Sequence, residues 1–209
     1  MRARRTLLLS LLLSAPPVLA ADQEAPPLPH SDPAVARAIA RVYPSLVQIH
    51  VLSTHTEGGR ERKSGATGSG VIISAEGHVI TNHHVVGRAT SIRVVLPTRE
   101  ELQASLVGTD PLSDIAVIQL ALSKRPKAAP ALPVAVFGQS ESVRVGDTVL
   151  AMGCPLALSQ AVTRGIVANV DLRVPRPIEL EGENVGSVVT WLGHHAQNLH
   201  GNYGRPLQN

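Results

Sequence analysis

Apolar and polar positions alternate with a period of two through much of the chain from residue 47 onward. Val47, Ile49 and Val51 alternate with polar residues, which is the pattern of a strand with one buried face. Further β-rich runs follow, separated by short turn-forming stretches, at 70–74, 78–81, 91–96, 101–108, 114–120, 144–153, 161–174 and 187–193. Many short strands at regular spacing predict an all-β barrel or sandwich.

One helix is expected ahead of these strands. A capping residue and a proline at the first helical position begin it within residues 31–33. Val35, Ile39 and Val42 then follow at the spacing of one apolar helix face, and Pro44 ends the helix. The fold class predicted is therefore all-β with a short N-terminal helix.

Two stretches lack a strand pattern. Residues 53–68 are polar and glycine-rich, and we expect a mobile loop there. Residues 121–133, ALSKRPKAAPALP, predict a linker because proline, alanine and basic residues replace the alternation. A linker in this place divides the chain into a first β unit at 33–120 and a second at 134–209.

The N-terminus has the features of a targeting segment. Residues 1–20 combine a basic start, an apolar run and a small-x-small sequence, which predicts a secretory signal peptide cleaved after Ala20. An uncleaved membrane anchor is the alternative, but the apolar run is short for a membrane span. The proline-rich residues 21–32 are interpreted as a flexible lead-in. The mature chain is expected in the periplasm or secreted, without a membrane span.

Removal of the signal changes the charge balance. The full chain has 19 basic and 16 acidic residues, and cleavage removes Arg2, Arg4 and Arg5 but no acid. The mature chain is therefore near neutral, and its charge gives no reason to expect a nucleic-acid partner. Cys154 is the single cysteine, so no intrachain disulfide forms and stability must come from packing.

Three stretches carry candidate chemistry. His84 lies in TNHHVV (81–86) just after a predicted strand, and Asp114 begins the run at 114–120. The glycine-rich turn GNYGRPL (201–207) follows near the end of the sequence. Acyl transfer by a hydroxyl group needs a base, a carboxylate that orients the base, and backbone N–H groups for the developing oxyanion.

Five stretches in the same order and spacing resemble the HtrA family of secreted, trypsin-like serine proteases. They are GSGVIISAEGHVITNHHVV (68–86), VGTDPLSDIAVIQL (107–120), VGDTVLAMGCP (145–155), VTRGIV (162–167) and GNYGRPL (201–207). The resemblance covers roughly residues 33 to 209 and implies a trypsin-like double β-barrel with the active site between the barrels. It also implies that the substrates are unfolded or extended polypeptides, that no cofactor is used, and that relatives assemble into trimers or larger homo-oligomers.

The resemblance assigns a role to each residue of the site. It makes His84 the general base and Asp114 the residue that orients it, with His83 at a variable position. It places the oxyanion hole at the backbone N–H groups of Gly201 and residue 203. Tyr203 stands where the family has the nucleophilic serine.

The chain departs from the family pattern near this same turn. Tyr203 replaces the serine, Arg205 replaces the second glycine, and His195 stands where relatives commonly carry aspartate. A tyrosine hydroxyl at the far end of a ring overshoots the base, and loss of the serine from such a triad costs about a million-fold in kcat. The sequence also stops at Asn209, where relatives continue, so we expect an incomplete second barrel. The prediction is an inactive peptidase domain.

Two other chemistries are less favoured. The pairs His83–His84 and His194–His195, together with His200, suggest zinc, but no carboxylate or cysteine stands at a recognised ligand spacing, and no metal is expected. Cys154 lies in a Gly-Cys-Pro turn with nothing to place it near His84, so a packed thiol is preferred over a substitute nucleophile. Three hypotheses stay open: a peptidase with a damaged nucleophile position, a pseudo-protease that binds extended peptides without cutting them, and a non-functional remnant.

Overall fold

The structure, a computed structural model, describes residues 32–57, 59–126, 128–154, 161–173, 178–180, 183–185 and 189–196. It begins with helix α1 (Pro33–Val42), followed by a 3₁₀ turn at Tyr43–Ser45. The remaining elements, in chain order, are β1 (Leu46–Glu57), β2 (Arg60–Ile72), β3 (His78–Thr81), α2 (His83–Val86), β4 (Ser91–Val95), β5 (Glu101–Asp110), β6 (Ile115–Leu120), β7 (Thr148–Gly153), β8 (Ala161–Leu172), β9 (Ile178–Leu180), β10 (Glu183–Val185) and β11 (Trp191–His194).

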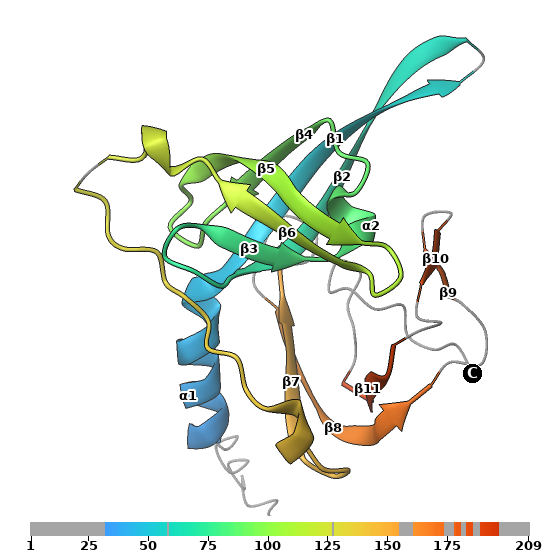
Figure 1. The fold of residues 1–209 in the computed structure, drawn as a ribbon. Coiled ribbons are helices and arrows are strands. Elements are labelled where there is room, and N and C mark those ends of the chain that lie inside the picture. The colour runs from blue at the N-terminus through green and yellow to red at the C-terminus, as the bar shows by residue number, and fades with distance from the viewer. Residues whose placement is uncertain are drawn as a thin grey trace, which may run out of the picture. The chain divides into compact units, whose positions relative to one another are not determined.

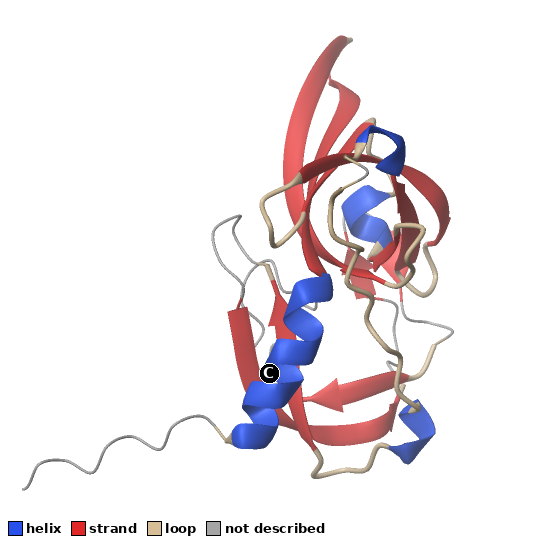
Figure 2. Cartoon of the chain, turned by 90° about the vertical axis from the view of Figure 1, so that its left-hand side faces the viewer, coloured by secondary structure: helices blue, strands red, loops and turns tan. Residues whose placement is uncertain are grey.

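The first six strands form a closed barrel in the order β1-β2-β3-β6-β5-β4, and every neighbouring pair is antiparallel. Figure 2 looks nearly along the barrel, where these strands form a ring. After them, β11-β8-β7 make a three-stranded sheet and β10-β9 a two-stranded one. The prediction of an all-β chain with a short N-terminal helix is confirmed.

The barrel core comes from the predicted alternation. The inward residues of the strands are apolar and almost completely buried, and α2 closes one end of the barrel with two valines; this core includes Val47, Ile49, Val51, Ile72, Val79, Val85, Val86, Val94 and Ile118. A period-two pattern places every second side chain on one face, so a closed ring of such strands encloses a single core.

Within the described residues, no helix is long and apolar enough to cross a membrane.

The prediction of a mobile loop at 53–68 is wrong. Strands β1 and β2 pair in register from Leu46–Val71 to Glu57–Arg60, so these residues form a long hairpin that projects beyond the barrel (Figure 1). Alternation of apolar residues reports burial of one face, whereas strand pairing depends on backbone hydrogen bonds. The distal hairpin is exposed and therefore carries no such pattern, although Gly59 has the positive φ of 77° that suits a turn.

Helix α1 has the predicted bounds, and its apolar face is only partly covered. It begins at Pro33 and ends at Val42, as predicted, and a 3₁₀ turn that contains Pro44 follows. None of the helix residues is buried, although Val35, Ile39 and Val42 are partly covered.

The stretch expected as a linker, 121–133, contains only a 3₁₀ turn at Leu122–Lys124 and no strand among its described residues.

Replacing Gly70 by alanine is expected to destabilise the barrel by about 1–3 kcal/mol, because overfilling a packed core forces neighbours to move. A β-carbon at Gly70 would lie 2.6 Å from Val79 Cγ1 and 2.9 Å from Ile49 Cδ1. Gly108→Ala is the matched control, since a β-carbon there meets nothing within 4 Å. Chemical denaturation measures both, and equal stability of the two variants would contradict the packing argument.

Candidate active site

His84 is positioned by the short helix that follows strand β3. Asn82 has an extended backbone (φ −90°, ψ 147°) and the helix begins at the next residue. Val85 and Val86 of the same helix are buried in the barrel core, which fixes the helix at the end of the barrel. His84 therefore stands on a rigid support, with only 12% of its side chain exposed.

Asp114 is positioned by the turn between strands β5 and β6. Its φ of +56° lies in the left-handed region, which aspartate and asparagine tolerate better than most residues. Asp110 builds this turn, because its carboxylate accepts hydrogen bonds from the Leu112 N–H (3.0 Å) and the Ser113 hydroxyl (2.7 Å). The Ser113 hydroxyl is the main reason that the pKa of Asp110 is lowered. Asp114 itself is only 3% exposed.

The structure brings the side chains of His84 and Asp114 together. His84 Nδ1 lies 2.7 Å from Asp114 Oδ2, and the backbone N–H of His84 donates to Oδ1 at 2.9 Å. Since a carboxylate can only accept, Nδ1 carries the proton and the lone pair of the neutral ring is on Nε2. A histidine held in this tautomer by a buried carboxylate can take a proton from a hydroxyl group.

Other donors also hold Asp114, and sequence reasoning did not identify them. The side-chain amide of Asn82 donates from Nδ2 to the Asp114 carbonyl (3.0 Å) and to Oδ2 (3.2 Å). The backbone N–H of His83 donates to the same carbonyl at 3.1 Å. A buried carboxylate is stable only when hydrogen-bonded, so these contacts belong to the site. The only sequence signal for Asn82 is its position two residues before His84.

His83 has a different environment from His84. It is 6% exposed, its Nδ1 lies 2.5 Å from Thr109 Oγ1, and a β-carbon at Gly87 would overlap its ring. The two histidines lie on a helix rather than on extended chain, yet their rings have different partners. In the part of the chain that the structure describes, no group of three or more histidine, cysteine, aspartate or glutamate side chains could hold a metal ion.

The remaining predicted residues are divided between described and undescribed parts of the chain. Gly201, Tyr203 and Arg205 lie outside the described residues, as does His200. His195 is exposed, and its Nδ1 accepts a hydrogen bond from the Ile166 N–H at 3.1 Å.

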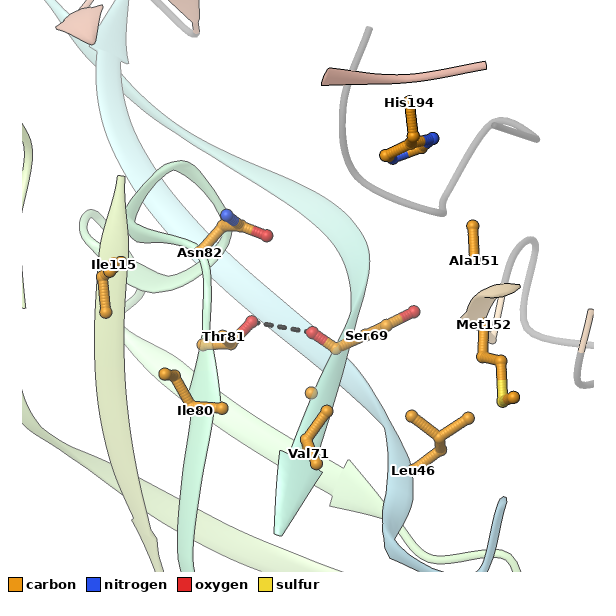
Figure 3. Close-up of a pocket in the computed structure, with 11 residues that line it drawn as sticks. Leu46, Ser69, Val71, Ile80, Thr81, Asn82, Ile115, Ala151, Met152 and His194 are labelled. Atoms are coloured by element: carbon orange, nitrogen blue, oxygen red, sulfur yellow. Dashed lines mark hydrogen bonds between the residues drawn. The ribbon is translucent and has the colours of Figure 1, made fainter. Parts of the chain in front are cut away.

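A cavity of about 330 Å³ has among its lining residues two that are near neighbours of His84 and Asp114 along the chain (Figure 3). Asn82 and Ile115, which lie close to His84 and Asp114 in the chain, line it on one side. Thr81 donates to the Ser69 carbonyl at 2.8 Å within its wall. The full lining is Leu46, Ser69, Gly70, Val71, Ile80, Thr81, Asn82, Ile115, Ala151, Met152 and His194. The cavity is mainly apolar with a few polar groups, a composition suited to a peptide side chain.

Cys154 is expected to react slowly with iodoacetamide at neutral pH. Burial raises the pKa of its thiol, so the thiolate that attacks the reagent is scarce. Alkylation followed by mass spectrometry should be slower than for glutathione at neutral pH, and its rate should rise at a higher pH than that of glutathione. Fast labelling at neutral pH would contradict this and revive Cys154 as a nucleophile.

Comparison with known proteins places the chain among trypsin-like peptidases. The profile of the family described as "Trypsin-like peptidase domain" matches residues 68–209, which are 142 of the 209 residues. A probable periplasmic serine endoprotease DegP-like from Pseudomonas putida (strain GB-1) is 45% identical over 111 residues, covering 53% of this chain and 22% of the relative. Serine protease HTRA2, mitochondrial, from Bos taurus is 35% identical over 175 residues, covering 84% and 36%.

Solved structures agree with these relatives. A variant of the HtrA-type protease AlgW with a tripeptide has a TM-score of 0.62 and 31% identity, covering 80% of this chain and 48% of that chain. AlgW with a tripeptide has a TM-score of 0.55 and 35% identity, covering 66% and 40%. The chain thus spans about a fifth to a third of the two curated relatives and less than half of these solved chains.

Proposed function

Because the chain belongs to the HtrA/DegP-like family of trypsin-like serine proteases, we propose that it is an exported HtrA-type peptidase domain that engages unfolded or extended polypeptides. The observation that carries the proposal is the hydrogen bond of 2.7 Å between His84 Nδ1 and Asp114 Oδ2, whose side chains are only 12% and 4% exposed. The peptides present with the related HtrA-type proteases support a polypeptide ligand.

The proposed mechanism assigns one task to each residue. His84 takes the proton of the attacking hydroxyl through Nε2, while Asp114 keeps its ring in the required tautomer and stabilises the imidazolium that forms. The backbone N–H groups of Gly201 and residue 203 receive the oxyanion. In the domain division that we propose, residues 33–120 supply the base and its orienting acid, and residues 134–209 supply the nucleophile turn.

Tyr203 removes one part of this mechanism. Its hydroxyl is separated from the backbone by an aromatic ring, so it cannot replace a serine hydroxyl within reach of the same base. We propose that the chain with Tyr203 and Arg205 binds extended polypeptide without hydrolysing it, as a pseudo-protease. Export to the periplasm through residues 1–20 is part of the proposal and is supported by the periplasmic DegP-like relatives.

The test measures binding and cleavage on the same sample. Anisotropy of a fluorescently labelled, reduced and alkylated protein reports binding of an unfolded chain, and gel electrophoresis reports cleavage. We expect saturable binding, no fragments, and no labelling by a serine-directed phosphonate probe. Fragments or probe labelling that disappear in a His84→Ala variant would overturn the assignment as inactive. Absence of both binding and a cooperative thermal melt would instead indicate a non-functional remnant.

A further inference from the structure

Asn82 stands at the N-cap of α2 but does not cap it. An asparagine at this position ordinarily uses its side-chain oxygen to accept a backbone N–H from the first turn. Here its side chain makes no such hydrogen bond. The Nδ2 group donates instead to the carbonyl and to the Oδ2 atom of Asp114, at 3.0 and 3.2 Å.

The carboxylate of Asp114 caps the helix in place of the Asn82 side chain. Its Oδ1 atom accepts the backbone N–H of His84, the second residue of the helix, at 2.9 Å. An unsatisfied N–H at a helix start is normally paired by the residue before the helix. In this chain the pairing comes from a residue thirty positions downstream, and the local cap residue supports that distant carboxylate.

These contacts fix the rotation of the Asp114 carboxylate, which sets the tautomer of His84. Rotation of the Asp114 carboxylate would move Oδ2 away from His84 Nδ1, its partner at 2.7 Å. The bond from Asn82 to Oδ2 opposes that rotation, and the bond to the Asp114 carbonyl holds the left-handed backbone beneath it. Asn82 also lines the cavity (Figure 3), so its amide connects the cavity wall to the carboxylate.

We propose that Asn82 is a positioning residue of the active site, which acts on His84 only by orienting the Asp114 carboxylate. The inference rests on the proposed function, because it assigns His84 and Asp114 as base and orienting acid. The competing view is that Asn82 simply starts the helix. Serine separates the two views, since it is an equally good N-cap but its hydroxyl is one atom too short to replace the amide.

The first experiment uses the full chain with Tyr203 in place. The Hδ1 proton of His84, bonded to a carboxylate, gives a strongly deshielded NMR signal that a His84→Gln variant identifies by its loss. Asn82→Ser is expected to broaden or shift this signal while the thermal melt stays near that of the parent. Gln103→Ala, the removal of an exposed amide on β5, is the matched control and should leave the signal unchanged.

Either of two results would overturn the proposal. An unchanged Hδ1 signal in Asn82→Ser would show that the amide does not orient the carboxylate. An unfolded Asn82→Ser variant would make Asn82 a structural residue. Both results are obtained without any proteolysis, so they decide the role of Asn82 even if the chain is not a peptidase.

The second experiment measures kinetics in the Tyr203→Ser/Arg205→Gly variant. A misplaced catalytic group costs about 10- to 100-fold in rate, so Asn82→Ser should lower kcat by that factor while KM changes less than about twofold. In an Asp114→Asn background the same substitution should add no further loss, because a double-mutant cycle cancels effects that act through one partner. A loss confined to KM, or one that persists in the Asp114→Asn background, would contradict the proposal. Absence of any proteolysis in the starting variant would show that more than the nucleophile turn separates this chain from active relatives, and the NMR result would then decide the role of Asn82.

Discussion

The double substitution Tyr203→Ser with Arg205→Gly is expected to raise peptide-bond cleavage by about a million-fold over the parent chain, the usual cost of losing a triad nucleophile. The reason is that the proposed base and its proposed orienting acid are in contact: His84 Nδ1 and Asp114 Oδ2 lie 2.7 Å apart, with side chains only 12% and 4% exposed. Release of fluorescence from a quenched, unfolded protein substrate measures the gain.

Two control variants and one further outcome decide how the result is interpreted. His84→Ala in the doubly substituted chain should abolish the gain, which ties the activity to this site rather than to a contaminating protease. Tyr203→Ser alone should recover less than the pair, because Arg205 places a side chain where the family turn has glycine. Cooperative unfolding with no cleavage by the doubly substituted chain would show that more than the nucleophile turn separates it from its active relatives.

The barrel could be predicted from the sequence because its determinants are local. Alternation of apolar residues marks the buried face of each strand, and the strands of the closed barrel follow the predicted runs closely. The exposed half of the hairpin formed by β1 and β2 was missed because strand pairing without burial leaves no such pattern. Periodicity therefore predicts strands only where one face is covered.

The site was predictable only in part. His84 and Asp114 were identified from their motifs, and the structure places their side chains in contact. The positive φ of Asp114 follows from the turn between β5 and β6, which its sequence does not mark. The role of the Asn82 amide depends on a contact between residues thirty-two positions apart, which its place two residues before His84 does not reveal. His83, taken as a variable position, is buried against Thr109, since the short helix turns its ring towards β5.

In the Tyr203→Ser/Arg205→Gly background, Asp114→Asn is expected to lower kcat by about 10⁴-fold. The asparagine tolerates the left-handed φ of 56° and nearly preserves the shape of the side chain. Its amide, however, can present N–H groups to His84 Nδ1 and so favours the tautomer with the proton on Nε2. His84 then has its lone pair directed away from the hydroxyl, and stopped-flow or steady-state kinetics on a peptide substrate records the loss.

Asp114→Ala separates the effect of the carboxylate on the His84 tautomer from the effect of strain in the Asp114 backbone. Alanine also abolishes the orientation of His84, but it must adopt the left-handed φ, which costs about 1–2 kcal/mol for residues other than glycine, asparagine and aspartate. It further leaves the His84 N–H, which Oδ1 now accepts at 2.9 Å, without that acceptor. Asp114→Ala should therefore unfold at a lower denaturant concentration than Asp114→Asn, although both are nearly inactive. Equal stability of the two would mean that the turn relaxes out of the left-handed region, and the carboxylate would then be needed for chemistry alone.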